Sequence, residues 1–221
     1  MPSEPDSQNS SGQRKDEKLF LVIVVALAIV AGVGSWFAAA AFARHDQLHG
    51  ILPDRERTLD NFSLTDENGR TVTRADLKGK ILVVSFVFTG CALTCPEVTR
   101  RMAEIQQLTA TSGDVKLVSL TVDPRSDTPS VLAKWGERFG ANTNRWYFLT
   151  GNKTVLLGLI ADSFLAQANS DPFNSMTGNF TGTERIAVVD KNGKTQIYFD
   201  GLRAETPAAV VKEIEKMRTA L

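Results

Sequence analysis

Cys91 and Cys95 are the only two cysteines in a chain of 221 residues, and they lie in one short loop. Pro96 follows at a position typical of the first residue of a helix, which would put Cys95 at the helix cap. A helix N-terminus carries unpaired N–H groups that stabilise a thiolate, so we expect a lowered pKa at Cys95. Two thiolates at this spacing can form a disulfide or hold a soft metal ion such as Cu(I). A complete zinc site is disfavoured because its usual second pair of ligands is missing.

The loop needs rigid elements on both sides, and the hydrophobic pattern supplies them. Two nearly continuous apolar runs, 81–88 and 115–122, are typical of strands buried on both faces. Shorter strands are expected at 62–64, 70–72, 146–149, 184–190 and 195–200. Helices are expected to start at Pro96, Pro129 and Pro207, where the missing N–H costs nothing, with a fourth over 153–164.

This order of elements predicts the fold and the place of the cysteines. Strands that alternate with helices and end in an antiparallel hairpin under a final helix describe an α/β sandwich of thioredoxin type, with a mixed sheet between helices. The cysteine loop leaves the first buried strand, at the carboxyl edge where reactive groups collect. In the second helix, Val131, Trp135 and Phe139 are expected to form the buried stripe, and Gly140 to end it.

The chain before this domain divides into three segments. Residues 19–43 carry no charge and are long enough to cross a membrane as a helix, so residues 1–18 are predicted to be a cytoplasmic tail, 44–60 a stalk and 61–221 the folded domain. Arg14, Lys15 and Lys18 precede the apolar run, which orients the N-terminus to the cytoplasm. A cleaved signal peptide is the rival interpretation. Acidic residues in the tail argue against a mitochondrial transit peptide, so we expect a single-pass protein of a bacterial inner membrane with a periplasmic domain.

The overall charge excludes one class of partner. Lys and Arg number 25, and Asp and Glu also number 25, which gives a formal net charge of zero. No global positive field exists to hold a phosphate backbone, so no nucleic-acid partner is expected.

Three segments together resemble the Sco/SenC family. They are TGCALTCPEVTRRM at 89–102, SLTVDPRSDTPSVLAKWGERFG at 119–140 and FLTG at 148–151. The resemblance implies a membrane-anchored, thioredoxin-like copper chaperone that assists assembly of the copper site of cytochrome c oxidase. It implies a copper site built from the two cysteines and one distant histidine. It also implies thiol–disulfide exchange with cysteines of a copper-site subunit, which is chaperone work rather than the turnover of an enzyme.

The histidine of that family pattern is absent here, because its position falls on Gly182 or Thr183. The only two histidines of the chain, His45 and His49, lie in the predicted stalk. Met176 and Glu184 are the other candidate third ligands, and methionine is a soft donor suited to Cu(I). Without an imidazole, Cu(I) is favoured over Cu(II), which prefers nitrogen and oxygen donors.

Two carboxylates follow the second buried strand. Asp123 is expected near the cysteine loop, where it either tunes a thiol and shuttles a proton or simply shapes the turn before Pro124. Asp127 is interpreted as the cap of the helix that follows Thr128.

Several alternatives stay open at this point. Helix placement favours Cys95 as the reactive thiol, whereas in thioredoxin-like loops the N-terminal cysteine, here Cys91, is usually the exposed attacker. A general thiol–disulfide oxidoreductase without copper would carry a proline just before the strand at 184–190, and residues 178–183 contain none. The peroxiredoxin pattern does not fit the residues before either cysteine. A non-catalytic interaction module would keep its function when both cysteines are replaced.

Overall fold

The computed structural model describes residues 50, 52–53, 56–164 and 184–219. The elements in chain order are β1 (Ser63–Thr65), β2 (Thr71–Thr73), the 3-10 helix η1 (Arg74–Leu77), β3 (Ile81–Val87), α2 (Thr94–Leu108), β4 (Val115–Thr121), α3 (Pro129–Arg138), β5 (Trp146–Leu149), α4 (Lys153–Ser163), β6 (Arg185–Val189), β7 (Thr195–Asp200) and α5 (Thr206–Thr219). Strand boundaries lie within one residue of those expected from the sequence. For β3 and β4 the reason is a long apolar run, which is typical of a strand buried on both faces.

Five strands form a mixed sheet in the order β5-β4-β3-β6-β7. β3, β4 and β5 run parallel, while β6 is antiparallel to β3 and to β7. Ser85 pairs with Ile186, so β6 begins at the same edge of the sheet at which β3 ends. Residues from the start of β6 therefore share an edge with the loop that follows β3.

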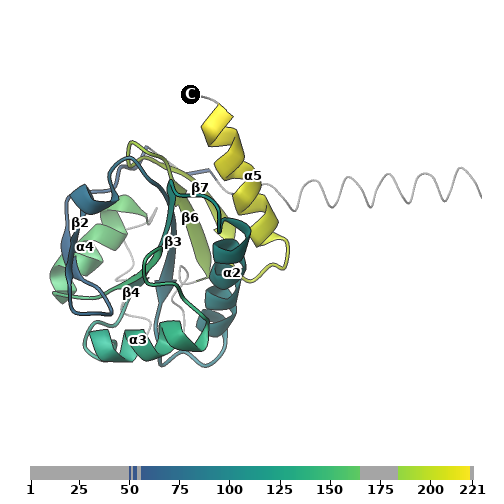
Figure 1. Ribbon diagram of the computed structural model, residues 1–221. Helices are drawn as coiled ribbons and strands as arrows, with labels where there is room; N and C mark the ends of the chain where they lie inside the picture. Colours follow the sequence, from purple (N-terminus) through teal and green to yellow (C-terminus); the bar gives the residue numbers. More distant parts are fainter. Residues whose placement is uncertain (1–49, 51, 54–55, 165–183, 220–221) are drawn as a thin grey trace, which may run out of the picture. The chain divides into compact units, whose positions relative to one another are not determined.

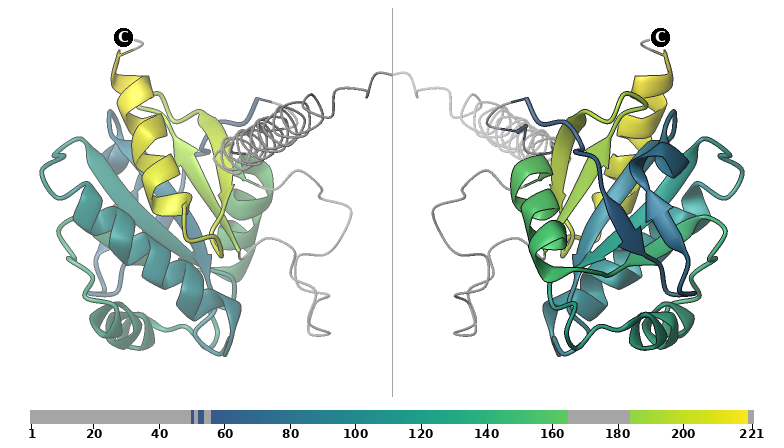
Figure 2. Two further views of the ribbon diagram at one scale, coloured as in Figure 1. Left: turned by 90° about the vertical axis from the view of Figure 1, so that its right-hand side faces the viewer. Right: turned by 90° about the vertical axis from the view of Figure 1, so that its left-hand side faces the viewer.

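The two faces of the sheet are covered by different elements. Figure 1 shows α2 and α5 on one side of the sheet and α4 with β2 on the other, and the two views of Figure 2 each bring one of these faces forward. Along β3 the side chains alternate accordingly, because successive residues of a strand point to opposite faces. Val83 packs in the cluster with Met102 of α2, while Val84 packs in the cluster with Leu156 of α4. This confirms the predicted thioredoxin-like sandwich.

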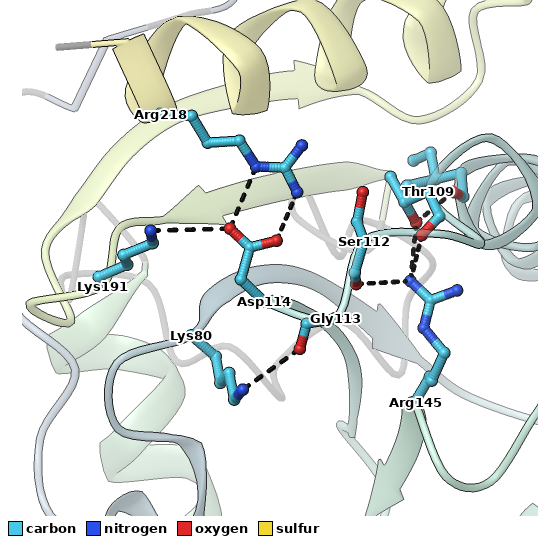
Figure 3. Close-up of polar contacts among 9 residues, drawn as sticks. Lys80, Thr109, Ser112, Gly113, Asp114, Arg145, Lys191 and Arg218 are labelled. Carbon is cyan, nitrogen blue, oxygen red and sulfur yellow. Dashed lines mark hydrogen bonds and ion pairs between the residues drawn. The ribbon is translucent and has the colours of Figure 1, made fainter. Parts of the chain in front are cut away.

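The amino edge of the sheet is tied together by charged groups. Asp114, just before β4, accepts two hydrogen bonds from Arg218 near the end of α5, at 2.5 and 3.1 Å, and lies 3.7 Å from the amine of Lys191 (Figure 3). Arg145 donates to the carbonyls of Thr109 and Ser112 just after α2, at 2.5 and 3.3 Å. These contacts fix the C-terminal ends of two helices to the sheet.

The segment before the domain is described only in part. Residues 1–43, with the predicted tail and membrane span, lie outside the described residues. Among the described residues, no helix is both long and apolar enough to cross a bilayer. The last residues of the segment predicted as a stalk contact the domain: Thr58 bridges to Lys194, and the guanidinium of Arg57 donates to the carbonyls of Ala161 and Asp162 at the end of α4.

Candidate dithiol site

The loop between β3 and α2 opens with a tight turn. The N–H of Cys91 donates to the carbonyl of Phe88 at 3.0 Å, which closes the turn over Thr89 and Gly90. A Cβ on Gly90 would lie 2.7 Å from the ring of Phe88, so a larger residue here would have to displace that ring. The turn directs Cys91 back toward the first turn of α2.

The start of α2 differs from the prediction. The helix begins at Thr94 with Leu93 as its N-cap, so Cys95 is the second helical residue and Pro96 the third. Cys95 is therefore not the cap residue, and the prediction that Pro96 opens the helix is wrong by two positions. Pro96 is still compatible with the helix, because the first turn has no intrahelical acceptor for its missing N–H.

The sulfur of Cys91 takes the place of a capping side chain. It accepts the N–H of Cys95 at 3.4 Å and lies 3.3 Å from the hydroxyl oxygen of Thr94. Both cysteines are free thiols. The unpaired donors and the positive end of the helix dipole therefore act on the sulfur of Cys91 rather than on that of Cys95. Thr94 was not singled out from the sequence, although a hydroxyl between two cysteines is a recognisable signal.

The two thiols consequently differ in acidity. Partial burial raises the pKa of Cys91, but the hydrogen bonds from Thr94 and from the N–H of Cys95 outweigh it and bring the pKa to about 7. Burial, reinforced by Cys91, raises the pKa of Cys95 to about 12. The expectation of a lowered pKa at Cys95 is therefore wrong. The N-terminus of α2 does lower the pKa of a thiol, but that thiol is Cys91.

Burial separates the cysteines as well. Cys95 is 1% exposed and packs with Val98 and Met102, while its carbonyl accepts the hydroxyl of Thr99 at 2.7 Å. Cys91 is partly exposed, and Leu93 between the two cysteines is 83% exposed. The arrangement presents one ionisable thiol to solvent and keeps a second thiol in the core behind it.

Asp123 follows the turn interpretation, whereas Asp127 does not follow the capping interpretation. Asp123 is half-buried and shapes the turn, since its N–H donates to the hydroxyl of Thr121 and its carbonyl accepts the N–H of Asp127. Asp127 does not cap α3, because the N-cap is Thr128. Instead its fully buried carboxylate accepts hydroxyl hydrogen bonds from Thr89 and Thr121, both at 2.5 Å. Asp127 therefore contacts the cysteine loop, and the capping interpretation is corrected.

Most candidates for a third metal ligand lie outside the described residues. These are His45, His49, Met176 and the family histidine position at Gly182 or Thr183. Glu184 is described: it immediately precedes β6, and its carbonyl accepts the N–H of Gly201 at 2.6 Å. Among the residues that the structure describes, no three His, Cys, Asp or Glu side chains form a metal-binding group.

The donor set suits one kind of ion. Two thiols in a single loop, one of them ionised near neutral pH, match the preference of soft Cu(I) for thiolate ligands. Cu(II) prefers nitrogen and oxygen donors in tetragonal geometry. The described part of the site fits Cu(I), with loss of the Cys95 proton as the step that binding must drive.

The fold and the loop define a thioredoxin-like protein with a dithiol at the carboxyl edge of its sheet. A structure of a SCO1/SenC family lipoprotein from Bacillus anthracis matches with a TM-score of 0.63 and 26% identity, over 75% of this chain and 99% of that one. A structure of BsSco, described as a member of the Sco family of cytochrome c oxidase assembly proteins with a disulfide switch, has a TM-score of 0.64 and 23% identity, over 76% and 98%.

Sequence comparison agrees with the fold. The SCO1/SenC family matches residues 52–219. A SCO1 protein homolog of Bacillus subtilis is 34% identical over 158 residues, which cover 68% of this chain and 82% of that protein. A SCO2-like protein of Rickettsia felis is 29% identical over 187 residues, 80% and 88% of the two chains. The chain belongs to the SCO1/SenC family.

Proposed function

We propose that this chain binds Cu(I) through Cys91 and Cys95 and acts on the cysteines of a copper-site partner, such as a subunit of a respiratory oxidase. The carrying observation is the asymmetric pair, in which Cys91 at the helix end has a pKa of about 7 and Cys95 behind it about 12. Family membership supports the assignment, as does the structure of Bradyrhizobium japonicum ScoI with copper bound, which matches with a TM-score of 0.57.

The same pair suits reduction of a disulfide on the partner. The Cys91 thiolate attacks one partner sulfur, the partner S–S bond breaks, and the second partner sulfur leaves as a thiolate that takes a proton. Cys95 then loses its proton to solvent and attacks the Cys91 sulfur, which releases the first partner sulfur as a thiol. The partner gains two electrons, and Cys91 and Cys95 become a disulfide. Exposure and acidity favour Cys91 as the attacking thiol.

The same proposal places the chain in a membrane with a defined orientation. The uncharged run at 19–43 would anchor the chain in a bacterial inner membrane, with the basic residues before it on the cytoplasmic side and the domain in the periplasm. Cleavage of the full chain in sealed, right-side-out vesicles by an external protease would remove the domain if this topology holds. Protection of the domain would contradict it.

A titration of reduced full-length protein with Cu(I), in competition with a coloured chelator and without oxygen, tests the copper assignment. One Cu(I) per chain, lost when Cys91 and Cys95 are both changed to Ser, is the expected result. Separate replacement of Met176 and Glu184 would then report a third ligand as a loss of affinity. Copper binding equal in the double variant would contradict the assignment.

A copper-free thiol–disulfide reductase is the second candidate. It is favoured by the absence of any histidine after residue 49 in the sequence, because the family site uses one. Under this alternative the wild-type chain shows no Cu(I) binding above the double variant, yet reduces a peptide disulfide and accumulates its own Cys91–Cys95 disulfide.

A further inference from the structure

Asp127 is fully buried, and it lies in the loop between β4 and α3 rather than in the cysteine loop. Its two carboxylate oxygens accept one hydroxyl hydrogen bond each, from Thr89 and from Thr121, both at 2.5 Å. The N–H of Thr89 also lies 3.3 Å from both oxygens. All of these partners are hydroxyl and amide groups, so the carboxylate acts as an acceptor hub at the carboxyl edge of the sheet.

The hub joins two segments that are distant in the sequence: the turn after β3, which holds Thr89, and the end of β4 with the loop that follows it. Thr121 is the last residue of β4 and pairs with Val87, the last residue of β3. The N–H of Asp127 donates to the carbonyl of Asp123 at 2.9 Å, which fixes the carboxylate relative to the end of β4. Asp127 is therefore a rigid reference point to which Thr89 is attached.

Thr89 in turn belongs to the tight turn that carries Cys91. That turn is closed by the hydrogen bond from the N–H of Cys91 to the carbonyl of Phe88. Its far end places the Cys91 sulfur 3.4 Å from the N–H of Cys95. A continuous series of contacts thus runs from the buried carboxylate through Thr89 to the sulfur of the partly exposed Cys91.

We propose that Asp127 is a positioning residue for the dithiol site, which holds Thr89 and thereby keeps the sulfur of Cys91 at the N-terminus of α2. The proposal rests on the proposed function only in taking Cys91 as the acting thiol. Neither copper nor a partner enters its argument. Asp127 touches no reacting atom and acts through Thr89.

The experiment measures alkylation of Cys91 by iodoacetamide in the reduced full chain between pH 5.5 and 9, with mass spectrometry to identify the modified residue. Thr89→Val removes the hydroxyl at nearly constant shape, and Thr89→Ser retains it. Asp127→Asn replaces one acceptor oxygen by a donor, so that one of the two hydroxyls loses its acceptor. We expect Thr89→Val and Asp127→Asn to slow alkylation at pH 7 about 3- to 10-fold, as loss of about one hydrogen bond implies. Thr89→Ser is expected to restore the wild-type rate.

Asp114→Asn is the matched control. Asp114 also holds two partners, Arg218 of α5 and Lys191 of the turn between β6 and β7, but at the opposite edge of the sheet (Figure 3). The control is expected to lower thermal stability and leave the alkylation profile of Cys91 unchanged. If Asp127 has a merely structural role, Asp127→Asn will also lower thermal stability and leave the alkylation profile of Cys91 unchanged. That result would overturn the proposal.

Two other results would also overturn it: an unchanged profile in a folded Thr89→Val chain, or an equal slowing in Asp114→Asn. If Asp127→Asn does not fold, the comparison of Thr89→Val with Thr89→Ser still tests the proposal. The outcome is independent of the copper titration, because alkylation of a free thiol requires neither metal nor partner. Failure to bind Cu(I) would leave the positioning role intact.

Discussion

The two ends of α2 lie at opposite edges of the central sheet and satisfy their backbone groups with different chemistry. At the C-terminal end, the guanidinium of Arg145 donates to the carbonyls of Thr109 and Ser112, and the neighbouring Asp114 is paired with Arg218. At the N-terminal end, the sulfur of Cys91 accepts the N–H of Cys95. One end is held by groups that are charged at neutral pH, the other by a group that must remain free to react.

This difference indicates how a reactive edge is built on a stable sheet. A carboxylate at the N-terminal end of α2 would cap the helix more strongly, but it would offer no thiolate for disulfide exchange or for a soft metal ion. Cys91 serves as a weaker cap and gains acidity in return, while Asp127 supplies rigidity from outside the loop. At the amino edge, the described contacts are ion pairs and charged hydrogen bonds.

The largest expected effect separates the two thiols of the reactive edge. In the wild-type chain, alkylation of Cys91 is expected to rise with pH around a midpoint of about 7, because its thiolate is stabilised at the helix end. In Cys91→Ser, the remaining Cys95 is expected to react about 100-fold more slowly at pH 7, since a buried thiol with a raised pKa supplies little thiolate. Iodoacetamide alkylation followed by mass spectrometry measures both.

Cys95→Ser is the matched variant for this test, and it should keep a fast-reacting Cys91. Equal rates for the two single variants would show that the helix end does not distinguish the thiols. The N-terminal end of α2 would then not be a site that makes one thiol more reactive than the other.

The second effect concerns the opposite end of the helix. Arg145→Met removes the donors to the carbonyls after α2 and is expected to lower the free energy of unfolding by about 1–2 kcal/mol, because these are charged hydrogen bonds in a partly buried place. Urea denaturation measures the loss, and the alkylation profile of Cys91 should not change.

Arg100→Met provides the control for Arg145→Met. Arg100 is an exposed arginine on α2 that pairs with Glu97, and its replacement should change stability by less than about 0.5 kcal/mol. A larger loss in Arg100→Met than in Arg145→Met would contradict the assigned role of Arg145.

A third, smaller effect follows from Asp114. The hydrogen bonds from Arg218 hold the pKa of Asp114 below its ordinary value of 3.8, although burial opposes this shift. Since the pKa is lower in the folded state, the stabilisation is present above pH 3.8 and is lost as the pH falls through the folded-state value. Asp114→Asn should therefore be less stable than wild type by about 0.5–1 kcal/mol at pH 6, and the difference should shrink toward pH 3. Thermal unfolding at both pH values measures it, and a constant difference would contradict the assignment.

The sequence was sufficient for the elements that hydrophobic burial determines. The apolar runs of β3 and β4 identify buried strands because no other structure hides so many β-branched side chains, and Gly140 ends α3 with a φ of 66°. The predicted stripe of α3 was right at Trp135, which is buried, but wrong at its first position. Of the adjacent pair there, Leu132 is buried and Val131 is 37% exposed. Two adjacent apolar residues do not show which of them faces the core.

The errors at the site have a different cause. The acidity of Cys91 and the partners of Asp127 depend on which side chains meet after folding, and spacing along the chain does not encode this. Asp127 precedes a helix and satisfies the usual pattern of a cap, yet its carboxylate turns inward to Thr89 and Thr121. The position of the cysteine loop could be predicted from the order of the elements. Which of its two thiols is acidic and exposed could be read only from the three-dimensional contacts.

The smallest effect is a difference in salt dependence between the two edges. The side chains of Arg218 and Asp114 are 32% and 31% exposed, so their attraction is screened as the Debye length falls from about 10 Å at 0.1 M salt to about 3 Å at 1 M. The stability difference between wild type and Asp114→Asn at pH 6 should therefore decrease by about a few tenths of a kcal/mol over this range. At the reactive edge, Cys91 is stabilised by direct hydrogen bonds of 3.3 and 3.4 Å, so the midpoint of its alkylation profile should move less. A midpoint that rises with salt as strongly as the Asp114 effect falls would mean that long-range charge, and not the contacts around the sulfur, sets the acidity of Cys91.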